Sequence, residues 1–490
     1  MSRPKTLGEL KASGWRSRSV KDEMRENLVR RLRERRPVFP GLVGYDRTVI
    51  PAVQDAILSR HDFILLGLRG QAKTRLLRAL PDLLDDEIPV IEGSELNEDP
   101  LRPLTGAMRE RVEREGDTLP VAWLPREARY HEKLATPDVT VADLIGDVDP
   151  IKAATKRLSF SDEGVIHYGI IPRTNRGIFA INELPDLAAR IQVGLLNLLE
   201  EGDVQIRGFP VRLPLDICLV FSANPEDYTN RGNIITPLRD RIASQILTHY
   251  PRTLDEGLAI TRQEAWVERE EGVEVSVPEL LARIVEQVAF EARESEFVDQ
   301  SSGVSARMTI SLMENVVSSA ERRGLITGER RVVARLADLF GSTSAVTGKV
   351  ELVYEGEREG VAAVALHLMG KAVRSALAEL LPDALAPAGP GDAAHDEAYL
   401  PILASFRAGL TLDVSDDVPE VEMRRRLDQI AGLRDLTESR LAPRDDAECT
   451  AAMELVLEAL HQSALLSRDA LVRGHAYSDP FDEMARSLRD

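Results

Sequence analysis

The chain has 490 residues, of which 43% are hydrophobic and 29% are charged, the composition of a globular protein with about two to four domains. Its 81 acidic residues outnumber its 62 basic residues, which argues against general binding to nucleic acid or to anionic membrane surfaces. The two cysteines, Cys218 and Cys449, exclude a disulfide framework and have no partner at metal-binding spacing. There is no apolar signal core and no apolar run near ~18 residues, so we expect a cytoplasmic protein.

The beginning of the chain is basic, unlike the rest. Residues 1–37 hold 12 Lys and Arg against 5 Asp and Glu. A helix is predicted over residues 20–36, because Met24, Leu28 and Leu32 follow each other at four-residue spacing on one face. We interpret this segment as an amphipathic helix docked on an acidic body, and a docking arm for a neighbouring subunit is the alternative.

The most informative stretch is residues 63–78, FILLGLRGQAKTRLLR. It predicts a buried strand over 63–66, a glycine-bearing loop over 67–72, and a helix that begins with Lys73 and Thr74. Such a loop aims successive backbone N–H groups and the positive end of the helix dipole at one point, where a phosphate fits. The lysine can reach the outer phosphates, and the neighbouring hydroxyl can hold Mg²⁺.

This stretch departs from the phosphate-binding consensus at Ala72, where glycine is usual. Alanine carries a Cβ, so we expect its φ to be negative. An ordinary strand–turn–helix joint with a solvated lysine is the alternative. The residues predicted to contact a nucleotide are Gly67, Leu68, Arg69, Gly70, Gln71, Ala72, Lys73, Thr74 and Arg75.

Two further apolar runs end in polar residues. Residues 177–183 predict a central parallel strand that ends in Asn182 and Glu183, and residues 217–223 predict another that leads to Asn224. Ligands of open α/β sheets bind at the carboxyl ends of the strands, so these side chains should converge on the phosphate loop. Residues 92–140 between the motifs look irregular, which is typical of a functional insertion.

ATP hydrolysis at this edge would need a base, an orienting polar group and a cation for the γ-phosphate. Glu183 is the natural base for the attacking water, and Asn224 could orient that water or the γ-phosphate. Arg241, Arg239 and Arg307 are the candidate cations. The alternatives are that Arg239 and Arg241 form plain surface ion pairs with Asp240 or Glu226, and that Arg307 caps a helix.

The order of these motifs resembles an AAA+ ATPase, and more narrowly the branch that contains MoxR proteins and the ATPase (I) subunit of magnesium chelatase. The loop at 67–74 resembles that of MoxR proteins, in which alanine before the lysine is common. The other matching segments are the second nucleotide motif (174–183), the first sensor (221–226), the segment with the trans-acting arginine finger (238–242) and the second sensor (303–307).

The resemblance covers roughly residues 40–325. It implies ATP and Mg²⁺ as cofactors, with the metal near Thr74 and Asn182, and a homo-oligomeric ring, most often a hexamer. It also implies that the catalytic residues are Glu183, Asn224, Arg241 and Arg307. The metal-associated aspartate of the family is Asn182 in this chain, so we expect slow hydrolysis with nearly normal ATP binding.

In the family, two inserted elements face the central pore of the ring. Residues 157–169 correspond to the insert in helix 2, and residues 203–212 to the hairpin before the first sensor. Phe160, His167 and Tyr168 in the first element could equally be core residues of a hairpin.

We therefore predict an α/β fold: a P-loop AAA+ core with a parallel sheet between helices, followed by a helical lid and a mostly helical C-terminal extension. A strand is expected at 349–354 and a linker at 386–391. The predicted parts are a basic helical N-terminal arm (1–38), a nucleotide-binding α/β domain (39–250), a helical lid (251–340), a strand–helix extension (341–385) and a helical C-terminal region (392–490).

The resemblance implies a remodelling, chaperone-like ATPase that acts with a partner carrying a von Willebrand factor A domain. The ATPase subunit of a magnesium or cobalt chelatase shares the same motifs and is an alternative. A third reading, suggested by Asn182, is a scaffold that binds ATP and hydrolyses it slowly. A GTPase switch is disfavoured, because the chain has no Asn-Lys-x-Asp motif.

Overall fold

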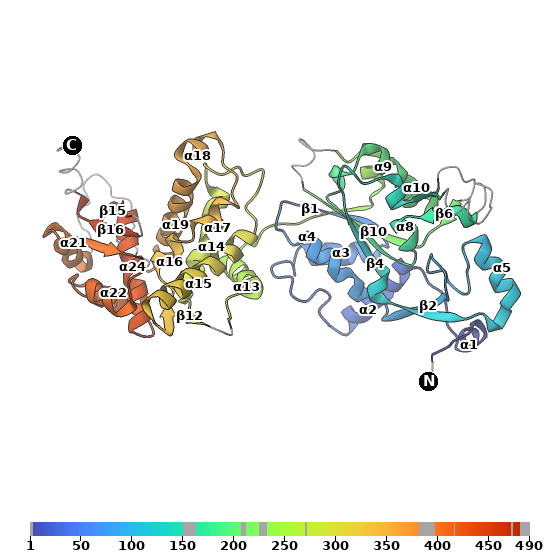
Figure 1. The fold of residues 1–490 in the computed structure, drawn as a ribbon, viewed down its shortest axis with the longest axis horizontal. Coiled ribbons are helices and arrows are strands. Elements are labelled where there is room, and N and C mark those ends of the chain that lie inside the picture. Colours follow the sequence, from blue (N-terminus) through green and yellow to red (C-terminus); the bar gives the residue numbers. More distant parts are fainter. Residues whose placement is uncertain are drawn as a thin grey trace. The chain divides into compact units, whose positions relative to one another are not determined.

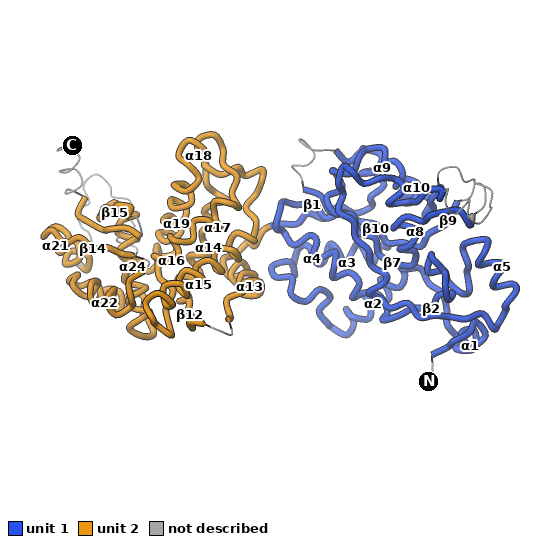
Figure 2. The backbone as a smooth tube through the Cα atoms, in the orientation of Figure 1, with its two compact units in different colours: residues 1–249 blue, residues 250–490 orange. Residues whose placement is uncertain are grey.

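The computed structural model describes residues 3–149, 163–206, 212–224, 233–269, 272–381, 397–415, 417–471 and 474–480. The chain forms two compact units, Met1–His249 and Tyr250–Asp490 (Figure 2). None of the described helices is long and apolar enough to cross a membrane. The predicted division into five parts is finer than these two units and stays a prediction.

Unit 1 is built on a five-stranded, all-parallel sheet with the order β11-β1-β10-β7-β4 (Figure 1). Leu66 lies opposite Ala223, and Phe221 lies opposite Ile181, so the carboxyl ends of the three central strands meet at one edge. The predicted α/β class with a central parallel sheet is confirmed. The strands are β1 (Phe63–Leu66), β4 (Tyr130–Leu134), β7 (Gly177–Asn182), β10 (Ile217–Ala223) and β11 (Ser244–Leu247).

Helices cover both faces of this sheet because the central strands are apolar on both sides. One face packs against α2 (Val20–Arg33), α3 (Val49–Leu58) and α4 (Lys73–Ala79). The other face packs against α8 (Ile170–Arg173), α9 (Ala189–Gly194), α10 (Leu196–Glu200) and α12 (Thr236–Arg241).

The first described residues are part of unit 1. Met24 and Leu28 of α2 are buried in the same core as β1, whereas Leu32, expected on the same face, is 39% exposed. Glu23 of this helix accepts hydrogen bonds from both terminal nitrogens of Arg129, at 2.8 and 2.6 Å, and both side chains are almost fully buried. Helix α2 is therefore tied to the sheet by packing and by a buried ion pair.

Removing one partner of that ion pair should cost far more than removing an exposed charge from the same helix. We expect Glu23→Ala to lower the free energy of unfolding by about 3–5 kcal/mol, because Arg129 would stay buried without a carboxylate. Glu26→Ala, which removes a carboxylate that is 58% exposed, should cost less than about 1 kcal/mol. Urea denaturation of both variants measures the difference, and equal losses would contradict the prediction.

Residues 92–140 are more regular than expected. They contain β3 (Val121–Pro125), which pairs antiparallel with β2 (Glu87–Ile91), and β4, which pairs with β7 at the edge of the main sheet. The prediction of an irregular insertion is therefore wrong for this part of the chain. The remaining elements of the region are α5 (Gly106–Glu115), η2 (Gly116–Thr118) and η3 (Arg126–Arg129).

Two short antiparallel strand pairs occur where pore-facing elements were expected. Strand β5 (Gly146–Val148) pairs with β6 (Ile166–Tyr168), and β8 (Asp203–Gln205) pairs with β9 (Arg212–Pro214). Tyr168 is buried and His167 is exposed. Phe160 and residues 207–211 lie outside the described residues. The other elements of unit 1 are α1 (Leu7–Ala12), η1 (Leu80–Leu83), α6 (Val141–Leu144), η4 (Glu163–Val165) and η5 (Leu184–Asp186).

Unit 2 is mostly helical, as predicted, but it also contains short strands. Strands β12 (Glu274–Ser276) and β13 (Arg331–Val333) form a parallel pair. Strands β14 (Leu412–Val414), β15 (Ser467–Ala470) and β16 (His475–Ser478) form an antiparallel sheet. The helices are α13 (Leu254–Glu264), α14 (Glu279–Glu294), α15 (Arg307–Thr327), α16 (Leu336–Phe340), α17 (Thr343–Thr347), α18 (Tyr354–Glu359), α19 (Val361–Leu377), η6 (Glu397–Tyr399), α21 (Leu400–Arg407), α22 (Glu420–Leu427), α23 (Leu433–Leu441) and α24 (Asp446–Gln462).

The strand expected at 349–354 is absent from the described part of unit 2. Leu352 makes only an isolated bridge with Val298, and α18 begins at Tyr354. The expected linker at 386–391 lies outside the described residues.

Candidate nucleotide site

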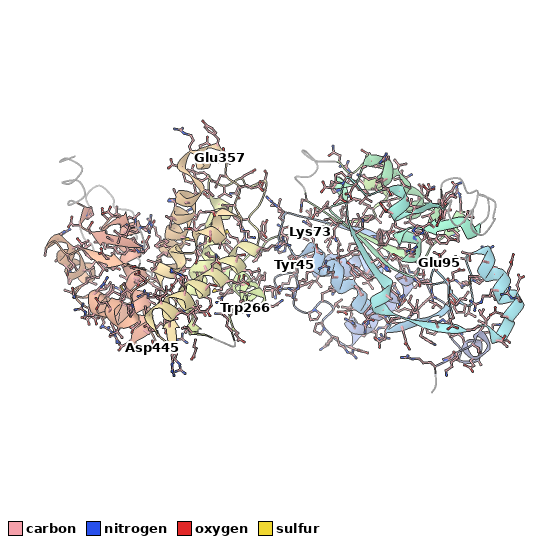
Figure 3. All side chains as sticks on the ribbon, in the orientation of Figure 1. Tyr45, Lys73, Glu95, Trp266, Glu357 and Asp445 are labelled. Atoms are coloured by element: carbon pink, nitrogen blue, oxygen red, sulfur yellow. The ribbon has the colours of Figure 1, made fainter. Side chains whose placement is uncertain are left out.

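The predicted phosphate loop connects β1 to α4. At its first residue, Gly67, an added Cβ would lie 2.0 Å from Thr248 Oγ1 and 2.1 Å from Gln71 Oε1, so no larger residue fits without rearrangement. The Thr248 hydroxyl donates to Gln71 Oε1 at 2.7 Å. Tyr45 donates its hydroxyl proton to the Gln71 carbonyl at 2.7 Å, and Figure 3 labels this tyrosine and Lys73. Side chains from two segments outside the loop, Tyr45 and Thr248, therefore fix its course.

Ala72 differs from the expectation. Its φ is +53°, in the left-handed region, and Gly70 two residues earlier has a φ of +74°. The expectation of a negative φ at Ala72 is therefore wrong. The left-handed conformation costs an alanine roughly 1–2 kcal/mol, which the rest of the loop has to offset. Ala72 packs against the core that includes Leu76 and Leu77 of α4, and this contact and the anchored Gln71 hold the backbone in place.

Lys73 is the first residue of α4, and its ammonium group lies against the backbone of the loop. It donates to the carbonyl oxygens of Gly67 and Leu68, the latter at 3.0 Å, and to Asn224 Oδ1. Only 7% of the residue is exposed. A lysine held at this depth places a positive charge where the loop N–H groups and the helix N-terminus also attract anions. The predicted contact residues Arg69 and Arg75 are exposed on either side of it.

Asn224 and Glu183 continue this contact across the sheet edge. Asn224, directly after β10, donates from Nδ2 to Glu183 Oε2 at 3.0 Å. Glu183 follows β7 with a φ of +55°, an uncommon conformation for a residue with a side chain and one that recurs at functional sites. Lys73, Asn224 and Glu183 thus form one hydrogen-bonded chain, from the start of α4 and from the ends of the adjacent strands β10 and β7. The structure brings together these three sequence-predicted residues.

Asn182 and Thr74 lie at the same edge. Asn182 ends β7 and is 8% exposed, and Ser222 Oγ lies 3.2 Å from its Oδ1. Thr74 is the second residue of α4 and is half-buried. Mg²⁺ prefers oxygen ligands and keeps several waters, so a hydroxyl and an amide oxygen beside phosphates fit this ion. The described residues contain no group of three or more His, Cys, Asp or Glu side chains that could hold a metal without such help.

Arg241 does not join this chain of contacts. Arg241 ends α12, where its guanidinium is 2.7 Å from a Glu200 carboxylate oxygen and donates to the Pro237 carbonyl at 3.0 Å. This partner is not the Asp240 that was considered, and the other residue considered, Glu226, lies outside the described residues. Arg307 begins α15 in unit 2 and is exposed, with its backbone N–H donating to Ser305 Oγ at 3.1 Å.

Glu132, on the strand next to β7, is an acidic residue that sequence reasoning missed. It lies on β4, and the Nε of Arg78 from α4 donates to its two oxygens at 3.1 and 3.0 Å. Arg78 holds the pKa of the Glu132 carboxyl below its usual value, and the hydrogen bond from Tyr130 acts in the same direction. Strand β4 is hard to predict from the sequence because its residues, YHEKL, contain no apolar run.

Comparison with known protein families finds no match. Two uncharacterized proteins, from Mycobacterium bovis and Mycobacterium tuberculosis, are each 25% identical over 217 residues, covering 40% of this chain and 37% of theirs. This chain therefore matches little more than a third of the length of these relatives. The hydrogenase transcriptional regulatory protein HoxA of Cupriavidus necator is 31% identical over 98 residues, which is 20% of each chain.

Solved structures with some likeness include NtrX from Brucella abortus, with a TM-score of 0.33 and 13% identity over 60% of this chain and 55% of that one. A complex of the magnesium chelatase subunits BchI and BchD has a TM-score of 0.32 and 21% identity over 66% of this chain and 99% of the matched chain.

Proposed function

We propose that the chain is an AAA+ ATPase that binds ATP with Mg²⁺ at the β1–α4 loop and hydrolyses it with Glu183 as the base. The observation that carries this proposal is the hydrogen-bonded chain of Lys73, Asn224 and Glu183, because it joins a phosphate-binding cation, a polar sensor and a carboxylate at one sheet edge. The motif order of an AAA+ protein supports the nucleotide assignment.

Each residue has a distinct chemical role in this proposal. Lys73 and the loop N–H groups neutralise the phosphate oxygens, and Glu183 accepts the proton of the attacking water. Asn224 is hydrogen-bonded to both Lys73 and Glu183. A phosphate that attracts the Lys73 ammonium group would therefore also change the hydrogen bond that Asn224 donates to the Glu183 carboxylate. Mg²⁺ supplies a positive charge that stabilises the leaving oxygens. Thr74 and Asn182 are the residues that would hold it.

Slow turnover follows from Asn182. An amide beside Mg²⁺ keeps an oxygen ligand but lacks the full charge of a carboxylate, and we expect this to cost roughly 1–3 kcal/mol of transition-state stabilisation. That loss equals about one to two decades in rate. A scaffold that binds ATP and barely hydrolyses it is therefore the second candidate function, and it depends on this one residue.

The proposal also includes how the chain assembles with other copies and with a partner protein. Arg241 pairs with Glu200 and makes no described contact with the Lys73 chain, so it is available to the site of a neighbouring copy in a ring, most simply a hexamer. We propose a remodelling activity that uses a partner with a von Willebrand factor A domain. The chelatase ATPase alternative shares every site residue with it.

The test of the proposed activity is phosphate release from ATP at saturating Mg²⁺. Lys73→Ala should lower turnover to background because it removes the buried cation of the loop, while circular dichroism shows a preserved fold. Lys11→Ala, which removes an exposed lysine paired with Asp117, is the control and should match the wild type. A Lys73→Ala protein that turns over ATP like the wild type would refute the proposal.

A further inference from the structure

We propose that a cavity at the amino edge of the unit 1 sheet binds a small organic carboxylate through the guanidinium groups of Arg176 and Arg102. This amino-edge cavity has a volume of about 310 Å³ and is lined by the residues that precede β7 and β10. The nucleotide site is at the opposite end of the same strands, which is roughly 20 Å away at ~3.3 Å per residue. The cavity is therefore a second site, and the inference goes beyond the proposed function.

The backbone of Arg176 is fixed at this edge by the segments around it. Its N–H donates to the Asp216 carbonyl at 2.6 Å, and its own carbonyl accepts from Arg129 Nε at 2.9 Å. The preceding residue, Asn175, accepts the N–H of Asp216 at 2.9 Å, which ties the starts of β7 and β10 together a second time. The fold therefore determines where the Arg176 side chain begins.

The side chain of Arg176 is buried without a carboxylate partner. Only 6% of the residue is exposed. Its Nη1 donates to the Pro89 carbonyl at 2.6 Å, but within the described residues Nε and Nη2 make no hydrogen bond and the guanidinium forms no ion pair. The neighbouring buried Arg129, in contrast, pairs with Glu23. A buried charge without a partner is costly, and a bound anion would remove part of that cost.

Two further donors that line the amino-edge cavity also lack a partner. Arg102 is exposed, and its side chain makes no hydrogen bond or ion pair with any residue that the structure describes. Ser17 Oγ is buried and finds no hydrogen-bond partner in the same part of the chain. The unpartnered groups are thus two cations and a hydroxyl, which together are suited to an anion.

The geometry and the charges favour a carboxylate among the oxyanions. Nε and Nη2 of Arg176 lie on one side of the planar guanidinium, so they can donate two parallel hydrogen bonds to the two oxygens of one ligand. Asp99 and Asp216 also line the cavity, where both already accept backbone N–H groups. Their negative charge opposes a doubly charged phosphate more than a singly charged carboxylate. Leu104 and Leu215 add apolar surface, which suits an organic acid.

The test is a titration of the full chain with benzoate, followed by ligand-observed NMR. We expect saturable binding of benzoate, weaker binding of inorganic phosphate, and no binding of benzyl alcohol, which has the ring without the charge. Arg102→Glu should weaken benzoate binding at least about tenfold, because it replaces an exposed cation of the cavity with an anion. Arg176→Met, which removes the buried guanidinium, should abolish saturable binding while thermal unfolding stays cooperative.

Two control variants make the test specific. Arg114→Glu reverses a 69% exposed arginine on α5 and should leave benzoate binding unchanged. Lys73→Ala should also leave it unchanged, because the phosphate loop lies at the opposite edge of the sheet.

The inference would be overturned by any of four results: benzoate does not saturate, it binds Arg102→Glu as tightly as the wild type, it binds more weakly than phosphate, or its binding is lost in Lys73→Ala. A wild-type chain that binds benzoate but not ATP would refute the proposed function and leave this inference standing.

Discussion

Glu183→Gln is expected to lower ATP turnover by about 10²–10⁴-fold, the usual contribution of a general base, while ATP binding stays within a factor of a few. The amide can still accept the hydrogen bond from Asn224 Nδ2 that the carboxylate accepts at 3.0 Å, so the geometry of the strand end should survive. What is lost is the ability to take a proton from water. Single-turnover phosphate release and the affinity of a fluorescent ATP analogue measure the two effects separately.

The control for this variant is Glu201→Gln, which changes an exposed acid beyond the end of α10. It should turn over ATP at the wild-type rate. If Glu183→Gln keeps full turnover, Glu183 is not the base. If it loses ATP binding and turnover together, its carboxylate serves the fold and not the chemistry.

Arg241→Ala is expected to reduce turnover by about 10³-fold or more, the scale of an arginine that acts on a phosphoryl group from a neighbouring subunit. Within its own chain this arginine pairs with Glu200, on the surface formed by α10 and α12, so its loss should leave ATP binding to the same subunit intact. Mixing Arg241→Ala subunits with Glu183→Gln subunits should restore part of the activity, because each variant supplies the group that the other lacks.

Arg239, an exposed arginine on the same helix, provides the control for Arg241→Ala. Arg239→Ala should have a much smaller effect than Arg241→Ala, and its mixtures should show no complementation. The assignment of Arg241 would be wrong if mixtures of Arg241→Ala and Glu183→Gln never exceed the more active component, or if Arg239→Ala shows complementation in its place.

The centre of unit 1 could be predicted because its strands are buried on both faces. Apolar runs at 63–66 and 217–223 coincide with β1 and β10, and the run at 177–183 contains β7. Polar residues directly after such runs have to emerge at the carboxyl edge, so Asn224 and Glu183 could be placed beside Lys73 from the sequence. Their mutual hydrogen bond became visible only with the side chains in place.

The edge strand β4 could not be predicted in the same way. An edge strand is paired on one side only, and the polar sequence YHEKL carries no apolar signal. The position of Glu132 beside β7 depends on the register between two strands that are far apart in the sequence, and no local pattern contains that information. The short strands of unit 2 could not be predicted either, because three or four residues are too few for a periodic pattern.

Ala72 shows the limit of arguing from one residue type. The absence of glycine suggested a negative φ, yet the loop imposes +53°, because the carbonyl of Gln71 is bound by Tyr45 and α4 begins one residue later. The environment of the loop outweighs the local preference of alanine at this position.

The most direct measurement is a calorimetric titration of ATP with Mg²⁺ into the wild-type chain and into Lys73→Ala. We expect saturable binding near one ATP per chain in the wild type, and a severe loss of affinity in the variant with its thermal unfolding still cooperative. No saturable binding to the wild type, or the same affinity in both proteins, would contradict a nucleotide site at the β1–α4 loop.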